Sequence, residues 1–240
     1  MNLEFDNYGF PKTVGVFETL KTIDGKVVEL SRHMRRALDS TQAQAIPMPS
    51  EEFLRSEIRK TLQEKPHNIG RLRVCFFAEG IHILHEEYVE SSAPLRLTLH
   101  AETIDGSVHK KFPYDERFAI LNSARSQGFD DAILFNSKNE ITESAVSNLL
   151  FKITDQWVTP PITSGVLPGI IRGLAIENCG VRVRPIHVSE IPEIDSALSL
   201  ASLRVAQPIS HIGEMKLDVG AQVTDMEQEI RSHLQLHSVG

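Results

Sequence analysis

A glutamate, a pair of lysines and a Pro-Gly turn are the groups in this sequence whose types and positions could support chemistry. Glu143 lies near the start of ITESAVSNLLF, residues 141–151, among small and apolar residues. A buried carboxylate without a partner is costly, so a glutamate in such a place usually has a cationic partner. The alternative is that Glu143 ends a strand and faces solvent, because glutamate is rarely fully buried. This segment alone allows both interpretations.

Lys110 and Lys111 follow His109 in a stretch with loop composition. A lysine amine is a nucleophile near neutral pH only when its pKa is lowered, and a neighbouring cation has that effect. Lysines in exposed loops are usually solvated, and that interpretation also fits these two residues. The pair is therefore a candidate nucleophile that needs support from other parts of the chain.

The Pro-Gly turn lies in VLPGIIR, residues 166–172, directly before a predicted helix. The first N–H groups of a helix have no intrahelical acceptor, so those of Gly169, Ile170 and Ile171 could bind a phosphate. Many helices begin with Pro-Gly and bind no ligand, and a plain turn is the alternative.

The N-terminal half contains elements that must position some of these groups. Two apolar runs around Asp24-Gly25, a favoured hairpin turn, predict paired strands over residues 14–30. Ser31 and Ser50 are the predicted N-caps of two helices. The faces expected to be apolar are Met34, Leu38 and Thr41 in the first helix and Phe53, Ile58 and Leu62 in the second. Strands are expected over residues 71–79, 81–88 and 95–102.

The stretch IDGSVHKKFP, residues 104–113, has the composition of a loop between the two halves. After it we expect a helix over residues 114–127, several strands, a short helix at IIRGLAIEN and a C-terminal helix from about Val223 to Leu236. The expected fold is α+β, with an N-terminal α/β subdomain at 1–104, an interdomain loop at 105–113 and a C-terminal subdomain at 114–240.

The composition indicates a folded globular protein, because 41% of the 240 residues are hydrophobic and 24% are charged. A formal net charge of -7 argues against a general nucleic-acid binder. No apolar run reaches the roughly 18 residues of a membrane span, and the N-terminus does not resemble an export signal, so a cytoplasmic location is expected. Cys75 and Cys179 have no second cysteine or close histidine in the sequence, so we expect buried thiols and no metal site.

Several motifs, taken in order, resemble one enzyme family. A lysine in the central loop is followed by GFDDAILFNSKNEITESAVSNLLF and then by TPPITSGVLPGIIR. This series resembles the fold-type IV pyridoxal-phosphate enzymes, the class IV aminotransferase family, which includes branched-chain aminotransferase, D-amino-acid aminotransferase and 4-amino-4-deoxychorismate lyase. GVFETLKTIDGKVVELSRHMRRALDS also resembles the N-terminal segments of this family. The resemblance covers nearly the whole chain, and it implies a small N-terminal α/β domain and a larger C-terminal mixed barrel-like domain.

The resemblance implies a role for each matched residue with the cofactor pyridoxal 5'-phosphate. Glu143 matches the glutamate that pairs with the pyridine nitrogen, so the cofactor would be its cationic partner. Lys110 matches the Schiff-base lysine, which is both nucleophile and general base. Lys111 is the alternative, because the spacing across this loop differs within the family. Asn148 lies in the same matched segment as Glu143 and is expected to contact the cofactor.

Phosphate binding is implied for three further matches. Arg36 matches the arginine of the family's H-x-x-R segment, and Ser202 matches a late hydroxyl position. The backbone of Gly169, Ile170 and Ile171 matches the helix start that binds phosphate. Ile171 stands where the family usually has threonine, so one hydroxyl is missing and somewhat weaker cofactor retention is expected. Arg36 could instead be a solvated helix arginine.

Within the family, the sequence is most similar to the lyase. Its N-terminus and its helix after Gly169 are short, and the segment at residues 202–204 resembles many lyase-type sequences. The implied reaction releases pyruvate and p-aminobenzoate, a folate precursor, from aminodeoxychorismate. Alternatives are an aminotransferase that acts on branched-chain or D-amino acids and a degenerate, non-catalytic family member. The expected substrate contacts are Phe17, Thr19 and Arg204.

The resemblance also implies partners. The family is generally dimeric, with the active site near the subunit contact, so a homodimer is expected. An aminodeoxychorismate synthase could supply the substrate in the same pathway.

Overall fold

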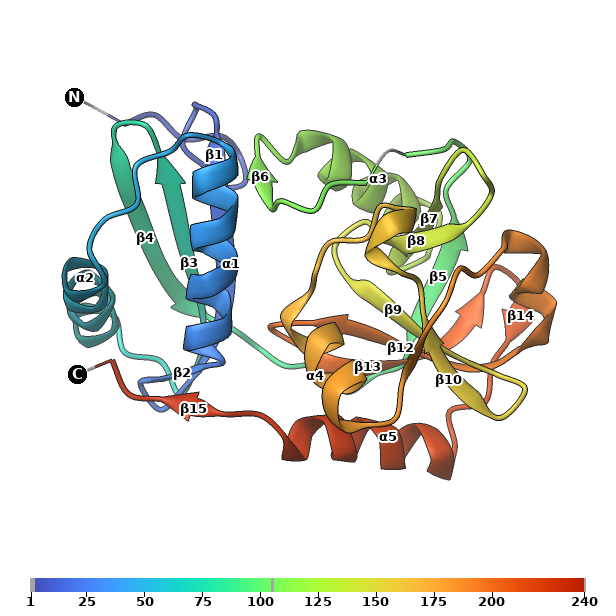
Figure 1. Cartoon of the computed structure of the whole chain (residues 1–240). Helices are drawn as coiled ribbons and strands as arrows, with labels where there is room; N and C mark the ends of the chain where they lie inside the picture. The colour runs from blue at the N-terminus through green and yellow to red at the C-terminus, as the bar shows by residue number, and fades with distance from the viewer. Residues whose placement is uncertain (1–2, 105, 240) are drawn as a thin grey trace. The chain divides into compact units, whose positions relative to one another are not determined.

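The computed structural model describes residues 3–104 and 106–239 of the chain. Its elements group into two compact units, which we describe one at a time (Figure 1). The first unit comprises Met1–Glu90, His109–Tyr114 and Leu234–Gly240, and the second comprises Ser91–Val108 and Asp115–His233.

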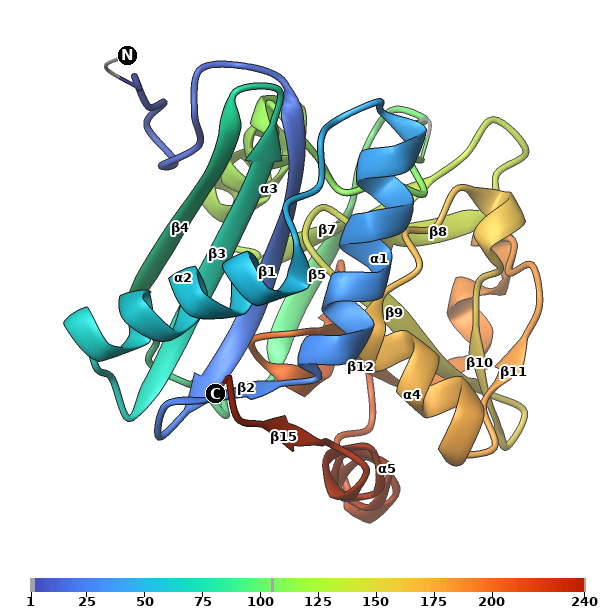
Figure 2. The same ribbon diagram turned by 60° about the vertical axis from the view of Figure 1, so that its left-hand side comes forward.

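The described part of the first unit consists of a six-stranded antiparallel sheet and two helices. Its elements are β1 (Gly15–Ile23), β2 (Lys26–Val28), α1 (Leu30–Ala43), α2 (Glu51–Glu64), β3 (Ile69–Phe77), β4 (Gly80–Glu87), β6 (Lys111–Phe112) and β15 (Leu236–His237). The strand order is β15-β2-β1-β3-β4, and β6 pairs with β1. Both helices cover one face of the sheet (Figure 2), and the core between them includes Leu20, Leu54, Ile58, Leu72 and Phe76.

The predicted hairpin and the predicted cap of α2 are confirmed. Asp24 and Gly25 join β1 to β2 with φ values of 47° and 74°, the left-handed backbone that a tight hairpin turn requires. The Ser50 hydroxyl accepts a hydrogen bond from the backbone N–H of Phe53. The predicted face of α2 needs one correction, because Phe53 is 50% exposed and its neighbour Leu54 is buried in its place.

The predicted start and buried face of α1 are wrong in part. Glu29 is the N-cap residue, and Ser31 lies inside the helix. Leu38, expected on the apolar face, is 40% exposed, whereas the polar residues His33 and Arg36 are buried. Apolar periodicity could not show this, because these two side chains are buried by a polar partner on β1.

A nine-stranded sheet and three helices make up most of the described part of the second unit. Its strands are β5 (Leu95–Leu99), β7 (Asp131–Phe135), β8 (Ile141–Ser144), β9 (Asn148–Ile153), β10 (Gln156–Thr159), β11 (Arg182–Val183), β12 (Ile194–Ala201), β13 (Val205–Ile212) and β14 (Met215–Lys216). Its helices are α3 (Asp115–Ser126), α4 (Ile170–Asn178) and α5 (Ala221–Ser232), with 3-10 helices at Ile162–Ser164 and Val188–Glu193. The strand order is β11-β10-β9-β12-β13-β5-β7-β8, and β14 pairs with β13.

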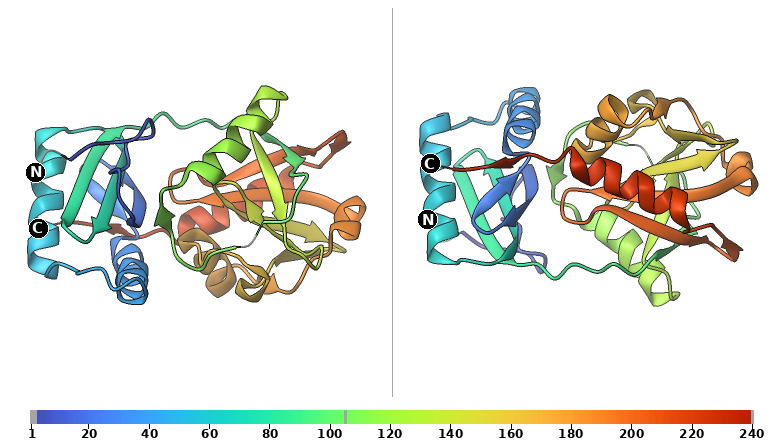
Figure 3. Two further views of the ribbon diagram at one scale, coloured as in Figure 1. Left: turned by 90° about the horizontal axis from the view of Figure 1, so that it is seen from above. Right: turned by 90° about the horizontal axis from the view of Figure 1, so that it is seen from below.

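This sheet curls around an apolar core, and α5 lies against β12 and β13 (Figure 3). The core includes Leu97, Ile133, Leu149, Phe151 and Ile209. The mixture of helices with a curled sheet confirms the predicted α+β class and its barrel-like C-terminal part. No helix within residues 3–104 and 106–239 has the length and apolar character that a bilayer span requires.

The segment ITESAVSNLLF forms two strands, β8 and β9, joined by a tight turn at residues 145–147. The turn packs over Asp131, which is fully buried and accepts a hydrogen bond of 2.7 Å from the Ser144 hydroxyl. Burial raises the pKa of Asp131, and the hydrogen bond from Ser144 opposes this shift. Because these contacts fix the turn, they also fix Glu143 and Asn148 on either side of it.

The division into units differs from the predicted boundaries. β5 pairs with β7 and β13 and so lies in the second unit, although the sequence analysis placed it in the first. Conversely, β6 and β15 pair with β1 and β2 in the first unit. Backbone hydrogen bonds between strands that are distant in the sequence therefore set the division. Asp105 of the predicted loop lies outside the described residues.

Candidate active site

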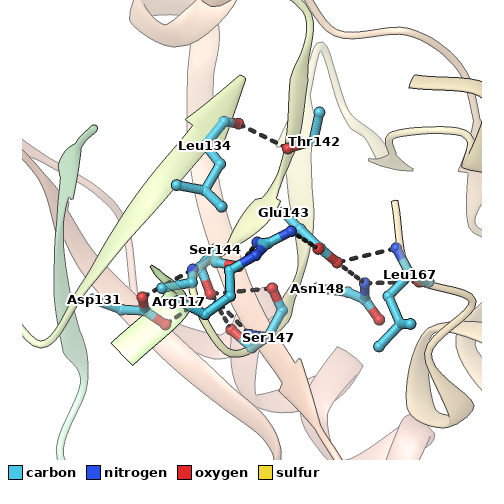
Figure 4. A network of polar contacts seen from close by, with 10 residues as sticks. Arg117, Asp131, Leu134, Thr142, Glu143, Ser144, Ser147, Asn148 and Leu167 are labelled. Carbon is cyan, nitrogen blue, oxygen red and sulfur yellow. Dashed lines mark hydrogen bonds and ion pairs between the residues drawn. The ribbon is translucent and has the colours of Figure 1, made fainter. Parts of the chain in front are cut away.

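Glu143 lies on β8 in the second unit, and it is buried, with 7% of its surface exposed (Figure 4). One carboxylate oxygen lies 3.0 Å from a guanidinium nitrogen of Arg117 on α3. The other oxygen accepts hydrogen bonds from the Asn148 side-chain amide at 3.2 Å and from the Leu167 N–H at 3.1 Å. Glu143 is therefore not a solvent-facing strand end. It is a buried carboxylate with a cationic partner.

Asn148, the first residue of β9, ties Glu143 to the loop before α4. Its amide nitrogen donates to Glu143 and also to the Leu167 carbonyl at 3.0 Å. Gly169 approaches the same side chain so closely that a Cβ there would lie 1.7 Å from Oδ1 of Asn148. A glycine is therefore required at residue 169 by close packing.

The start of α4 is only partly available as a set of N–H donors. The Gly169 N–H donates to the Leu167 carbonyl at 2.7 Å, so the expectation that this donor is exposed is wrong. Gly169 is the N-cap residue and provides no side-chain acceptor for the first turn, where Ile170 and Ile171 begin the helix. The Ile171 side chain is buried in the interior, which gives a packing reason for an apolar residue in place of threonine.

Arg172 fixes the loop before α4 from the other side. Its guanidinium donates to the Thr159 hydroxyl at 3.2 Å and to the Pro160 carbonyl at 2.7 Å. It therefore connects the TPP and LPGIIR motifs, which the sequence analysis quoted without giving this arginine a role.

The residues expected after β12 lie in a turn between β12 and β13. Ser202 and Arg204 are both half-buried there. The charge of Arg204 acts on the nearby Asp131 carboxylate and favours its ionised form, although burial is the larger influence on that group. The Arg204 carbonyl accepts a hydrogen bond of 2.9 Å from Arg231 of α5, which holds the turn in place.

In the first unit, Arg36 forms part of a buried cluster with Glu18 and His33. Arg36 donates to the two Glu18 oxygens through Nε at 2.8 Å and Nη2 at 2.6 Å, and Nδ1 of His33 lies 2.6 Å from Glu18. Burial alone would raise the pKa of Glu18, but Arg36 and then His33 outweigh it and lower this pKa to about 2. Burial also lowers the pKa of His33, despite the opposing charge of Glu18. Arg36 is therefore a buried, paired arginine, and the solvated alternative is wrong.

The two candidate lysines have different surroundings. Lys111 is exposed on β6, whereas Lys110 is half-buried. The Lys110 amine lies 4.6 Å from the ring centre of Phe17 and 5.2 Å from that of Tyr114. The backbone N–H of Phe17 donates to the Lys110 carbonyl at 2.9 Å, which fixes the chain at this lysine. Thr19, the other expected substrate contact on β1, is half-buried and pairs in register with Arg73 of β3.

The predicted residues thus form two groups, one in each unit. Lys110 lies with Phe17 in the first unit, which also holds Arg36. Glu143 lies with Asn148 and the start of α4 in the second. The sequence analysis missed Arg117, Arg172 and Glu18. Only Glu18 carried a signal, because it lies inside the quoted F-E-T-L motif.

Comparison with known proteins gives a family match and a curated relative. The family model for amino-transferase class IV matches residues 15–212. A protein of Schizosaccharomyces pombe (strain 972 / ATCC 24843), named "Putative aminodeoxychorismate lyase", is 26% identical over 174 residues, which are 68% of this chain and 73% of that protein.

Solved structures share the fold over most of the chain. A Legionella pneumophila structure named "Putative 4-amino-4-deoxychorismate lyase" has a TM-score of 0.84 and 21% identity, over 91% of this chain and 90% of that chain. A "hypothetical aminotransferase" of Mycobacterium tuberculosis in its PLP-bound form has a TM-score of 0.80 and 16% identity, over 91% and 88% of the two chains. These structures establish the fold.

Proposed function

Since the chain belongs to the amino-transferase class IV family, whose members depend on pyridoxal phosphate, we propose that it is a 4-amino-4-deoxychorismate lyase. The observation that carries cofactor binding is the buried Glu143, held beside the start of α4 by Arg117, Asn148 and the Leu167 N–H. The lyase is supported by the S. pombe relative and by the lyase-like segment at residues 202–204.

The described residues of the second unit fit the cofactor. Glu143 provides a buried acceptor for the pyridine nitrogen, and Asn148 holds that acceptor in position. The first turn of α4 has no side-chain cap, so the N–H groups of Ile170 and Ile171 can donate to a phosphate. Ser202 is a further proposed phosphate contact. When bound, pyridoxal phosphate draws electrons away from the substrate Cα.

Arg36 of the first unit is also a proposed phosphate contact. Glu18 engages its Nε and Nη2 atoms and so fixes the plane of the guanidinium. A fixed guanidinium loses little side-chain entropy when it forms a further hydrogen bond. The Glu18 carboxylate neutralises the charge of Arg36, so this contact would contribute orientation more than net attraction.

Lys110 is the proposed lysine that holds the cofactor covalently. It is half-buried against Phe17 and Tyr114, which orient the amine, whereas Lys111 is exposed. Once the substrate has replaced it on the cofactor, the Lys110 amine can remove the proton from the substrate Cα. In the lyase, a group on the neighbouring carbon then leaves as pyruvate, and the ring becomes p-aminobenzoate. Phe17, Thr19 and Arg204 are the proposed substrate contacts.

The second candidate is a class IV aminotransferase that acts on branched-chain or D-amino acids. It is favoured by the PLP-bound M. tuberculosis aminotransferase, which shares the fold. Both reactions begin with removal of the Cα proton, so the residues above serve either one. They differ in whether a neighbouring group leaves or the proton returns to the cofactor.

One assay distinguishes the two activities. The purified protein, loaded with pyridoxal phosphate, receives aminodeoxychorismate with no keto acid present. The lyase releases p-aminobenzoate and pyruvate in equal amounts. If turnover instead requires a paired amino donor and keto acceptor, and no p-aminobenzoate is formed, the protein is an aminotransferase and the lyase proposal fails.

A second experiment assigns the lysine. Borohydride reduction of the loaded protein fixes the cofactor to the amine that holds it, and peptide mapping then identifies the labelled residue. We expect the label on Lys110. The matched variants are Lys110→Ala, which should lose the label, and Lys111→Ala, which should keep it. A label on Lys111 in the wild-type protein would reverse the assignment.

Assembly, location and pathway complete the proposal. The protein would act as a cytoplasmic homodimer in folate synthesis, with an aminodeoxychorismate synthase supplying its substrate. Sedimentation velocity of the loaded protein tests the first of these points, because a chain of 26.9 kDa should sediment as a dimer of twice that mass.

A further inference from the structure

Three side chains of metal-binding type meet at the C-terminal ends of α4 and α5 in the second unit. Cys179 is the C-cap residue of α4, Glu229 lies in the last turn of α5, and His233 is the C-cap residue of α5. One thiol sulfur, one carboxylate oxygen and one imidazole nitrogen all lie within 4.8 Å of one another. The three residues take no part in the candidate active site.

The geometry of α5 directs two of these groups to the same place. Glu229 and His233 are four residues apart, so they share one face of the helix. Val223, Met226 and Ile230 are buried and fix the rotation of α5 about its axis.

The end of α5 and the end of α4 are both held. Arg231 of α5 donates to the Arg204 carbonyl at 2.9 Å and to the Ala206 carbonyl at 3.1 Å. α4 packs against α5, and the backbone N–H of Cys179 donates to the Ala175 carbonyl at 3.0 Å. The three groups are thus presented by fixed backbone.

The electrostatics of this cluster favour a cation. Burial raises the pKa of the Cys179 thiol to about 11, and the negative charge of Glu229 acts in the same direction. A divalent metal ion would stabilise the thiolate and neutralise the carboxylate together. Without one, a buried thiol faces a carboxylate that it cannot neutralise.

The ligand types select the metal. Calcium and magnesium prefer sets made of oxygen alone, whereas a sulfur, a nitrogen and an oxygen together suit zinc. Ligand atoms of a tetrahedral zinc site lie about 3.5 Å apart, so a shift on the order of 1 Å in the side chains would close this set. Glu229 is exposed and can make that adjustment.

We propose that Cys179, Glu229 and His233 form a zinc site with a fourth position open to water. The ion would link the end of α4 to the end of α5, directly before Leu234, where the chain leaves the second unit. The sequence analysis expected no metal site, because no histidine lies close to Cys179 in the sequence. The fold brings Glu229 and His233 to it from 50 or more residues away.

Cobalt titration tests the site, because Co²⁺ reports its ligands by absorbance. The full chain, without a polyhistidine tag, is stripped with a chelator, reduced with a phosphine and titrated with Co²⁺. We expect one ion per chain, a thiolate-to-cobalt band in the near ultraviolet and visible bands of a four-coordinate ion. Addition of Zn²⁺ should remove all of these bands.

Matched variants identify the ligands. Cys179→Ser should lose the near-ultraviolet band, and His233→Ala and Glu229→Gln should each weaken Co²⁺ binding by about tenfold or more. Glu227→Gln, on the same helix but paired with Arg231, should bind as wild type, and so should Cys75→Ser, which changes the other thiol.

Two results would overturn the proposal. One is Co²⁺ binding without a thiolate band in the wild-type protein. The other is unchanged affinity in both exposed-ligand variants, His233→Ala and Glu229→Gln, which would remain informative even if Cys179→Ser failed to fold. Neither result bears on the proposed lyase activity, which is measured separately.

Discussion

Arg117 of α3 and Glu143 of β8 form an ion pair with a nitrogen–oxygen distance of 3.0 Å, and the two side chains are only 12% and 9% exposed. The carboxylate proposed to bind the cofactor is thus already balanced by a charge from its own chain. Arg117 also lies 3.4 Å from the Ser144 carbonyl, so it contacts the strand on which Glu143 lies. Arg117 therefore acts as a positioning residue for Glu143.

Replacement of Arg117 by methionine should destabilise the protein. The change leaves Glu143 buried without its charged partner, and breaking a buried pair in this way costs about 3 kcal/mol in the free energy of unfolding. Urea unfolding measures this quantity. Arg117→Lys keeps the charge and should lose less, and the double variant Arg117→Met/Glu143→Gln should recover part of the loss. Equal stability of the methionine and lysine variants would show that the ion pair contributes little.

Replacement of Glu143 by glutamine should reduce catalysis much more than folding. The amide keeps the size of the side chain but cannot hold a positive charge on the pyridine nitrogen, so we expect kcat to fall by at least about 100-fold. Steady-state kinetics give kcat, and circular dichroism checks the fold. A variant with near-normal kcat would remove Glu143 from the cofactor site.

Replacement of Gly169 by alanine should weaken cofactor binding. The new Cβ would lie 1.7 Å from Oδ1 of Asn148, so this side chain must move and release its hydrogen bonds to Glu143 and Leu167. We expect the Kd for pyridoxal phosphate to rise by about tenfold, which corresponds to roughly 1.4 kcal/mol. The double variant Gly169→Ala/Asn148→Ala removes the clash and serves as the control. If it binds no better than Asn148→Ala while Gly169→Ala binds normally, the clash has no effect.

Stability should fall in acid because of the Glu18 cluster. The pKa of Glu18 in the folded protein is about 2, against an ordinary value of 4.5. Its carboxylate therefore stabilises the fold above pH 4.5, and about 3 kcal/mol is lost as the pH falls from there toward 2. His33 acts in the same direction, because burial lowers its pKa and the unfolded chain takes up the proton first as the pH falls below 6.5.

The measurement is the free energy of unfolding between pH 7 and pH 3. Glu18→Gln should be less stable than wild type at pH 7 and should show a flatter decline below pH 4.5. Glu4→Gln changes an exposed glutamate and should follow the wild-type curve. A Glu18→Gln protein with the wild-type pH dependence would contradict the assignment.

Local patterns allowed much of the fold to be predicted. Asp24-Gly25 requires a tight turn, and Ser50 followed by an apolar face predicts a capped helix. Both depend on residues that are neighbours in the chain, so the sequence alone determined them. The ordered motifs around Glu143 and VLPGIIR likewise identified the family, because each motif is a continuous stretch.

Tertiary structure decided which polar groups meet. The sequence predicted an apolar face for α1 that includes Leu38, yet His33 and Arg36 are buried there because Glu18 of β1 lies opposite them. Arg117 has no motif of its own, and only the packing of α3 against the sheet brings it to Glu143. The pairing of Cys179 with Glu229 and His233 arises in the same way, from two helix ends.

The physical reason is the range of each interaction. Turn chemistry, capping and apolar periodicity act over a few residues, so the sequence by itself determined the elements and the family of this protein. Ion pairs and buried hydrogen bonds depend on where strands and helices pack, and a carboxylate shows no local sign of the arginine that will neutralise it. Those partners, and with them the charge state of the candidate site, were decided only by the tertiary structure.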